Sequence, residues 1–336
     1  MRLLILGGTI FVGRHCAAEA LSRGHQVTLF HRGRHGTDLF PSAERILGDR
    51  DGGLEALGHG TWDAVLDPSG YVPRVVDASA RYLRDRCNLY VYISSISAYA
   101  DLSRPGTAED AALASLPDPT IEEVTDETYG GLKAACDEVV QERLGDRGLV
   151  IRPGLIVGPW DPTDRFTYWP VRFARGGEVL VPGDPERPVQ FVDVRDLAAW
   201  IVSMCEQGRG GVYNAVGPSD RTTFRELIEA CREAGAKDCS EVWVSDEFLL
   251  EQGVEPWSDL PLWLPDYSEY RGLDNVDGSR AWSAGLMTRP ISASVKDALD
   301  WFAAHRGGEP LRVGISMERE QELLALWRAG NRGDRL

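Results

Sequence analysis

The sequence predicts an α/β fold, a doubly wound parallel Rossmann sheet followed by a smaller, mainly C-terminal domain. Three observations support this prediction. Short apolar runs alternate with helical patterns through about the first 155 residues, as in a parallel sheet covered by helices on both faces. The first apolar run, Arg2–Leu6, leads directly into glycines. After Pro159 the alternation loosens, which indicates a second domain.

The elements of the first part are assigned from apolar runs and from helical spacing. Six strands are expected, at Arg2–Leu6, Gln26–His31, Arg45–Leu47, Ala64–Asp67, Leu89–Ser94 and Leu149–Arg152. Helices are expected at Phe11–Arg23, Val72–Arg86 and Tyr129–Leu144. The buried face of the first helix is marked by Val12, Cys16, Ala17, Ala20 and Leu21, and Gly24 ends that helix.

The pattern after Pro159 is assigned in the same way. Helices are expected near Phe166–Ala174, Val194–Glu206, Thr223–Glu233, Ser294–Ala304 and Met317–Arg328. Strands are expected near Val179–Val181, Gln190–Val192 and Gly211–Ala215, the last returning to the main sheet. Residues 1–158 and 188–217 are therefore assigned to the Rossmann domain. Residues 159–187 and 218–336 are assigned to the smaller domain and a C-terminal tail.

Composition limits the classes of function. The chain has 336 residues, of which 43% are hydrophobic, enough for a sizeable core. The formal charge of −16 would repel a phosphate backbone, so a broad nucleic-acid surface is not expected. Six cysteines without a C-x-x-C pair indicate buried thiols rather than disulfides or a metal site. No apolar run is long enough for a membrane span, and the N-terminus is interpreted as a strand rather than a signal peptide, so a cytoplasmic protein without a membrane partner is expected.

The first strand ends in a turn that is typical of dinucleotide binding. The turn comprises Gly7, Gly8, Thr9, Ile10, Phe11, Val12 and Gly13. Glycines allow the tight turn and the close approach of the backbone to a pyrophosphate, which then lies on the amides of the helix start. A third glycine would stand where this chain has Ile10, and we expect Gly8 to relieve part of the crowding.

The end of the second strand bears on cofactor choice. An acidic residue there would bind a free ribose 2′-hydroxyl, whereas cations would pair with a 2′-phosphate. The segment contains His31, Arg32 and Arg34 and no carboxylate, which favours NADP(H), with NAD(H) as the alternative. Asp49 is expected to accept a hydrogen bond from the adenine amino group. The other residues predicted to border the cofactor are Arg50, Pro68, Ser69 and Gly70.

Tyr129 and Lys133 lie one helical turn apart, so both side chains can reach one bound molecule. A phenol ordinarily ionises near pH 10, and a fixed cation nearby lowers that pKa. The pair follows the glycine turn and a buried strand that ends in Ser94-Ser95. The combination indicates proton transfer beside a bound cofactor.

Taken as an ordered set, these motifs resemble the extended short-chain dehydrogenase/reductase family, in its NAD-dependent epimerase/dehydratase group, from Met1 to about Asp196. The resemblance implies that Ser95 is the active-site hydroxyl and Tyr129 the acid/base. It implies that Lys133 holds the nicotinamide ribose and that the segment at Pro153 and Gly154 passes beside the carboxamide. A homodimer or a tetramer would be typical of the family.

The expected activity is NADP(H)-dependent oxidation or reduction of a carbonyl/alcohol pair on a small molecule. The alternative is an NAD(P)-dependent sugar or nucleotide-sugar epimerase. Ile96 and Ser97 replace the acidic pair of the dehydratases of the family, so dehydration is not expected. Leu155 and Val189 replace residues with which many members bind a nucleotide diphosphate.

A third alternative is a non-catalytic cofactor- or RNA-binding protein, because the glycine turn also resembles that of a chloroplast stem-loop RNA-binding branch. Candidate substrate residues are Ser97, Tyr168, Arg172 and Arg271. The polar insertion between Ala100 and Thr128 is interpreted either as a border of the substrate entrance or as a solvated surface loop.

Overall fold

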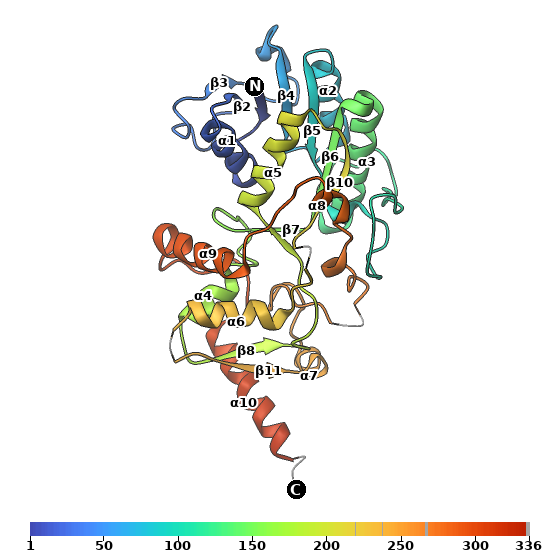
Figure 1. Ribbon diagram of the computed structural model, residues 1–336. Coiled ribbons are helices and arrows are strands. Elements are labelled where there is room, and N and C mark those ends of the chain that lie inside the picture. Colours follow the sequence, from blue (N-terminus) through green and yellow to red (C-terminus); the bar gives the residue numbers. More distant parts are fainter. Residues whose placement is uncertain (219, 237, 266–267, 334–336) are drawn as a thin grey trace. The chain divides into compact units, whose positions relative to one another are not determined.

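The computed structural model describes residues 1–218, 220–236, 238–265 and 268–333 (Figure 1). The chain forms two compact units. Unit 1 comprises Met1–Ile156, Phe191–Ser219 and Val276–Thr288. Unit 2 comprises Val157–Gln190, Asp220–Asn275 and Arg289–Leu336.

Unit 1 is built on a parallel sheet of seven strands in the order β10-β6-β5-β4-β1-β2-β3. The strands are β1 (Arg2–Leu6), β2 (Gln26–His31), β3 (Glu44–Leu47), β4 (Trp62–Asp67), β5 (Cys87–Ile93), β6 (Gly148–Pro153) and β10 (Gly211–Ala215). Strand β1 pairs with β2 on one side and with β4 on the other. The chain order therefore reverses at β1, and in such sheets ligands bind at the carboxyl ends of the strands beside this point.

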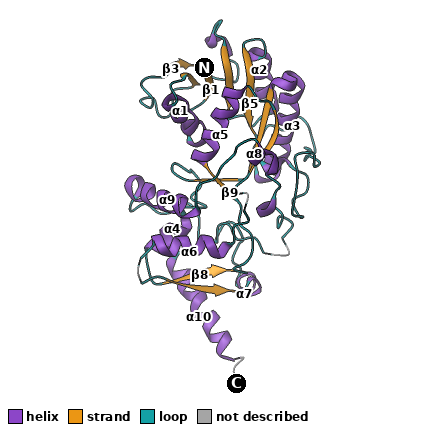
Figure 2. Cartoon of the chain, in the orientation of Figure 1, coloured by secondary structure: helices purple, strands orange, loops and turns teal. Residues whose placement is uncertain are grey.

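Helices cover both faces of this sheet (Figure 2). The helices α1 (Phe11–Ser22) and α5 (Val194–Gln207) enclose one apolar core, whereas α2 (Pro73–Leu83) and α3 (Asp126–Leu144) enclose the other. Pro73 occupies the first turn of α2, where its missing N–H costs nothing. Helix α3 starts three residues earlier than predicted, because Thr125 and Thr128 form a reciprocal capping box.

The predicted fold class is confirmed, and the predicted strands of the main sheet are all present within two residues at each end. The sequence analysis missed several short elements: β7 (Leu155–Val157), β11 (Ser240–Val244), α7 (Asp246–Glu251) and α8 (Ser279–Ser283). Strand β7 pairs with β9 (Phe191–Asp193) in a separate two-stranded sheet. Three-residue strands leave too few apolar residues for a periodic pattern, so their detection depends on tertiary pairing.

Unit 2 combines helices with a two-stranded parallel sheet. The sheet pairs β8 (Glu178–Pro182) with β11. The further helices are α4 (Tyr168–Ala174), α6 (Phe224–Ala234), α9 (Ile291–Arg306) and α10 (Met317–Gly333). Trp169 and Trp263 are fully buried here, and the Trp169 indole donates to the carbonyl of Pro261 at 2.8 Å. These tryptophans therefore contribute to the core of the unit.

One domain boundary was predicted wrongly. Residues 276–288 were assigned to the smaller domain, but they belong to unit 1. Trp282 Nε1 donates to the carbonyl of Val216 at 3.0 Å, and Trp200 Nε1 of helix α5 donates to the carbonyl of Ala284 at 3.1 Å. Such indole bonds are formed only in the folded chain, so a local sequence pattern does not reveal them.

Candidate functional site

The glycine turn after β1 has the backbone that was expected. Gly7 and Gly8 have φ values of 117° and 86°, and a Cβ on Gly8 would lie 2.6 Å from the Leu29 side chain. A Cβ on Gly13 would lie 3.0 Å from the Gly8 backbone and 3.1 Å from Pro68. Helix α1 can therefore pack closely on the turn only with glycine at these positions.

Ile10, in place of the third glycine, has an extended backbone with φ of −126°. Its side chain is 56% exposed, so the turn accommodates it by directing it outwards. Ile10 is also the N-cap of α1, and no side chain caps that helix end. The amides of the first turn are thus suited to an anion such as a pyrophosphate, which fits the predicted dinucleotide site.

The end of β2 holds one neutral and two exposed basic residues. Gly33 N–H donates to His31 Nδ1 at 3.0 Å, which places the imidazole proton on Nε2. Burial, together with the charge of Arg45, lowers the pKa of His31. His31 is therefore neutral near pH 7 and does not supply the positive charge expected of it. Arg32 and Arg34 are exposed.

Arg32 Nη1 lies 4.0 Å from Asp49 Oδ2, with about half of each side chain exposed. The two residues predicted for the phosphate and the adenine are thus neighbours. An exposed pair of this kind contributes little to stability and can be exchanged for a ligand contact. The predicted roles of both residues stay predictions.

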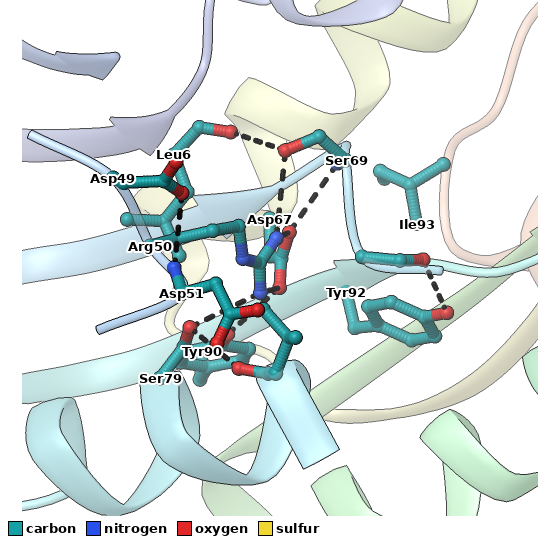
Figure 3. A network of polar contacts seen from close by, with 12 residues as sticks. Leu6, Asp49, Arg50, Asp51, Asp67, Ser69, Ser79, Tyr90, Tyr92 and Ile93 are labelled. Atoms are coloured by element: carbon teal, nitrogen blue, oxygen red, sulfur yellow. Dashed lines mark hydrogen bonds and ion pairs between the residues drawn. The ribbon is translucent and has the colours of Figure 1, made fainter. Parts of the chain in front are cut away.

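Arg50 has a different role from the one predicted (Figure 3). Its guanidinium binds Asp67 at the end of β4 through two hydrogen bonds, of 2.5 and 2.6 Å. It also donates to Ser79 Oγ at 3.1 Å, and Tyr90 donates to the same Asp67 carboxylate at 2.9 Å. Arg50 therefore stabilises the end of β4. Its guanidinium makes these contacts within the protein, so the predicted contact with the cofactor is not supported.

The turn formed by residues 67–70 contacts both the glycine turn and helix α3. Ser69 Oγ donates to the Leu6 carbonyl at 2.8 Å, directly before Gly7. At the other end, the Gly70 carbonyl accepts from Lys133 Nζ at 2.8 Å. A Cβ on Gly70 would lie 2.7 Å from the Tyr92 ring, so this position requires glycine. Residues 67–70 thus contact both predicted parts of the site, the glycine turn and the helix that carries Lys133.

Lys133 is buried, with 3% of the residue exposed. Its ammonium donates to the carbonyls of Gly70 and Ile93, each at 2.8 Å, and to the hydroxyl of Tyr92 at 3.1 Å. Burial lowers the pKa of Lys133 to about 8. The residue is therefore a cation at neutral pH that is held by protein groups on the sheet side of α3.

Tyr129 lies at the start of α3, one turn before Lys133, and its ring centroid is 6.4 Å from that of Tyr71. Tyr71 in turn places its ring over the Lys133 ammonium, with the centroid 4.7 Å from Nζ. The sequence analysis did not identify Tyr71. Its position could have identified it, because Tyr71 follows Gly70 just after the end of β4, at the edge of the sheet where ligands bind in such folds.

The turn that carries Ser95 packs directly on α3. Ser95 caps a short 3₁₀ helix (Ile96–Ala98) by accepting from the amide of Ser97 at 3.1 Å. A Cβ on Gly130 would lie only 2.4 Å from the Ser97 carbonyl oxygen. Glycine next to Tyr129 is thus what allows the helix to approach the serine turn. The elements that carry Ser95, Tyr129 and Lys133 are therefore in contact, and the catalytic roles of these residues stay predictions.

The insertion before α3 packs on the same turn. Tyr99 and Leu113 form an antiparallel bridge, and the amide of Ala114 donates to the carbonyl of Ala98 at 2.8 Å. A Cβ on Gly131 would lie 2.9 Å from the Leu116 side chain. Residues 111–116 therefore form an ordered wall, a segment that packs against the serine turn and α3, so the insertion is not only a solvent-exposed loop.

A buried polar network lies behind this wall. Arg152 on β6 donates to Asp137 of α3 at 2.8 Å and to the Tyr99 hydroxyl at 2.9 Å. Tyr99 donates to Asn214 Oδ1 at 2.6 Å, and the backbone N–H of Asn214 donates to the Glu109 carboxylate at 2.9 Å. The network fixes the end of β6.

Beyond this end, the predicted cofactor residues Pro153 and Gly154 are buried and half-buried respectively. A Cβ on Gly154 would lie 3.1 Å from the Val216 side chain, so glycine allows the close approach of the chain to β10. The contact of these two residues with the carboxamide stays a prediction.

Of the candidate substrate residues, Ser97 lies in unit 1 and the others in unit 2. Arg172 lies in the core of unit 2, where it is 3% exposed and pairs with Glu320 at 2.7 Å. It also donates to the carbonyls of Gly176 and Glu178, so its donors serve the fold and the substrate role predicted for it is not supported. Tyr168 is buried with 3% exposure, whereas Arg271 is exposed.

Within the described ranges, no group of three or more His, Cys, Asp or Glu side chains is arranged to hold a metal ion. In those ranges no helix has the length and apolarity required to cross a bilayer. All six cysteines are free thiols.

The candidate site consists of four segments of unit 1: the glycine turn, the turn at residues 67–70, the serine turn and the start of α3.

Comparison with known proteins gives one family model and several relatives. Residues 67–216 match the model of the NAD dependent epimerase/dehydratase family. The chloroplast stem-loop binding protein of 41 kDa b from Arabidopsis thaliana is 28% identical over 70% of this chain, and the match spans 63% of that protein. UDP-arabinose 4-epimerase 1 from Arabidopsis thaliana is 22% identical over 91% of this chain and 80% of its own length.

Solved structures share the fold. The UDP-glucose 4-epimerase of Thermotoga maritima, solved with UDP-glucose, has a TM-score of 0.65 at 18% identity, covering 90% of this chain and 99% of that one. The UDP-glucuronic acid 4-epimerase of Bacillus cereus, solved with NAD, has a TM-score of 0.62 at 15% identity, with coverage of 90% and 99%.

Proposed function

We propose that the chain is a member of the extended short-chain dehydrogenase/reductase family, in its NAD-dependent epimerase/dehydratase group, and that it is an NAD(P)-dependent epimerase of a sugar or nucleotide sugar. The observation that carries the proposal is the buried Lys133 ammonium, one turn after Tyr129 on a helix packed against the Ser95 turn. The epimerases among the relatives favour this reaction over net reduction.

A bound nicotinamide would supply a hydride acceptor that later returns the hydride. The glycine turn and the start of α1 would hold its pyrophosphate. Tyr129 takes the proton from the substrate hydroxyl as the carbonyl forms, and returns it when the hydroxyl re-forms. Ser95 donates a hydrogen bond to the same oxygen, which stabilises the charge that develops there. Lys133 favours the ionised phenol by its positive charge.

An epimerase needs no external reductant, and this provides the test. Purified protein with NAD would be incubated with a panel of UDP-hexoses, UDP-pentoses and UDP-hexuronic acids and followed by ¹H NMR. We expect interconversion of epimers with no net change of absorbance at 340 nm. The Tyr129→Phe variant should bind NAD normally while turnover falls by at least about 1,000-fold, within the range for loss of a proton-transfer group. Full turnover in that variant would exclude Tyr129 as the acid/base.

A second candidate is an NADP(H)-dependent reductase, because Arg32 and Arg34 follow β2 without a carboxylate. It predicts stoichiometric consumption of NADPH with a carbonyl substrate. Fluorescence titration would show tighter binding of NADPH than of NADH, and Arg32→Ala would remove that difference. Equal affinities in the unmodified protein would reject the NADP(H) assignment and leave the epimerase.

A further inference from the structure

A groove lies at the edge of the main sheet where the strands begin, and we call it the amino-edge groove. Its volume is about 410 Å³, and all of its lining belongs to unit 1. It is bordered by the starts of β1, β4 and β5 and by the turn before β6. Strand β1 has five residues, each of which advances a strand by about 3.3 Å, so the groove lies about 15 Å from the glycine turn. The charged residues that line the groove are Arg2, Asp63, Asp85, Arg86 and Arg147.

Two of these arginines are each held by one nitrogen of the guanidinium. Arg2 Nη2 donates to the hydroxyl of Thr61 at 2.7 Å. Arg147 Nη1 donates to the carbonyls of Arg84 and Cys87 at 2.7 and 3.0 Å. These acceptors are neutral, so they orient each guanidinium without neutralising its charge. Within the described part of the chain, the other two nitrogens of each guanidinium form no hydrogen bond, so they remain for a ligand.

Arg86 is held in the same way. Its Nη1 donates to the carbonyl of Gly58 and, at 3.2 Å, to the hydroxyl of Tyr82. The carbon of its guanidinium lies 4.2 Å from the centroid of the Tyr82 ring, which fixes one face of the group. Among the described residues, none of the three arginines forms an ion pair with a carboxylate. Three oriented cations therefore border one groove, in a chain whose formal charge is −16.

The two carboxylates of the amino-edge groove interact with other donors. Asp63 Oδ2 accepts from the backbone N–H of Arg2 at 2.6 Å. Asp85 Oδ1 lies 3.6 Å from Nε of Arg84, a residue that does not line the groove. Because three guanidiniums face two carboxylates that already have partners, the groove has a net positive charge and suits a small anion.

A second pocket adjoins the amino-edge groove and shares Arg2, Thr61 and Trp62 with it. The volume of this adjoining pocket is about 690 Å³. Trp62 is 7% exposed, so its ring offers little surface for stacking on a nucleobase, and a sugar is the better occupant. Hydroxyl, amide and carboxylate groups suited to the hydroxyls of a sugar are presented by Gln26, Thr28, Ser42 and Glu44.

We propose that the amino-edge groove and the adjoining pocket together form a binding site for a sugar phosphate. The phosphate lies among Arg2, Arg86 and Arg147, because guanidiniums bind phosphate oxygens through paired N–H donors. The sugar lies in the adjoining pocket, and Arg2 borders both parts. This site is separate from the candidate site at the carboxyl ends of the strands, so the proposal does not rest on the proposed function.

Isothermal titration calorimetry of the full chain tests the site. Glucose 6-phosphate, inorganic phosphate and glucose would be titrated separately at one pH and constant ionic strength. We expect one molecule of glucose 6-phosphate per chain, bound at least about tenfold more tightly than inorganic phosphate, because the sugar adds hydrogen bonds in the adjoining pocket. Equal affinities for the two phosphates, or no binding of glucose 6-phosphate, would overturn the proposal. Glucose that bound as tightly as its phosphate would overturn it as well, since the arginines would then take no part.

Variants locate the binding. Arg2→Gln and Arg147→Gln should each weaken the affinity for glucose 6-phosphate by about tenfold, as for the loss of one charge-assisted hydrogen bond. Arg104→Gln is the matched control, because Arg104 is an exposed arginine of unit 1 that does not line the groove. It removes the same charge and should leave the affinity unchanged. Unchanged affinity in Arg147→Gln, or an equal loss in Arg104→Gln, would overturn the proposal.

A second pair of variants keeps the proposal testable if the arginine variants do not fold. Asn88 lines the amino-edge groove with an exposed side chain, so its replacement leaves the core intact. Asn88→Asp adds a negative charge beside the phosphate and should weaken the binding of glucose 6-phosphate by at least about threefold at low salt. Asn88→Gln is neutral and should bind as the unmodified protein does. The same affinity in Asn88→Asp as in Asn88→Gln would show that the phosphate lies elsewhere.

Discussion

Gly130→Ala tests the contact between helix α3 and the serine turn. The added Cβ would lie 2.4 Å from the Ser97 carbonyl oxygen and 3.4 Å from the Ser97 carbonyl carbon. Ordinary contact between a methyl group and an oxygen requires at least about 3.2 Å, so helix or turn must move by nearly 1 Å. The obstacle is backbone, which cannot rotate away as a side chain could.

Two contributions to the free energy of unfolding of this variant oppose one another. Alanine gains about 1 kcal/mol over glycine within a helix, whereas overpacking costs about 1–3 kcal/mol. We therefore expect the free energy of unfolding to fall by no more than about 2 kcal/mol, so the variant stays folded. Catalysis is more sensitive, since a displacement of about 1 Å in a reacting group can cost about 100-fold in rate.

Urea denaturation and turnover under substrate saturation measure the two effects. Gly330→Ala on α10 is the control for helix propensity, because a Cβ there meets nothing within 4 Å. It should raise stability slightly and leave turnover unchanged. If Gly130→Ala were as stable and as active as the unmodified protein, the serine turn would not depend on this approach of α3, and the reasoning would be wrong.

Two further predictions concern buried charges. Arg50→Leu leaves the fully buried Asp67 without its bidentate partner, so we expect the free energy of unfolding, measured in urea, to fall by about 3 kcal/mol. NAD affinity should also weaken, because the turn at residues 67–70 loosens. An unchanged midpoint of urea denaturation would contradict this prediction. For Lys133, the folded pKa of about 8 lies below the ordinary 10.5, so the unfolded chain binds more protons between these values. The difference in free energy of unfolding between the unmodified protein and Lys133→Met should therefore be constant below pH 8 and rise in favour of the unmodified protein by about 3 kcal/mol up to pH 10.5. A difference that did not change with pH would show that the ammonium is not desolvated.

Residues that form local patterns were predictable from the sequence. The strands of unit 1 follow apolar runs, and the glycine turn follows from its spacing, so the fold class and the positions of Ser95, Tyr129 and Lys133 were accessible. These features depend on neighbours along the chain. Their relative placement follows from the rule that parallel strands end at one edge of the sheet.

Features that depend on distant partners were not predictable. Arg172 was predicted to bind the substrate, and only its pairing with Glu320, 148 residues later, shows that it is a core residue. Arg50 likewise is committed to Asp67 by tertiary contact. Tyr92 stands within an apolar strand, where its hydroxyl gave no sign that a lysine from α3 would reach it.

The hydrogen bonds of Arg152 affect how unit 1 comes apart. Its guanidinium is bonded to the Glu109 carbonyl of the insertion at 3.1 Å as well as to Asp137 and Tyr99. Release of the insertion from the sheet would leave the buried Arg152 cation without the Glu109 carbonyl, which makes such partial unfolding costly in free energy. The insertion and the sheet should consequently unfold as one cooperative block, and a protease should cut the native chain elsewhere before it cuts near Glu109.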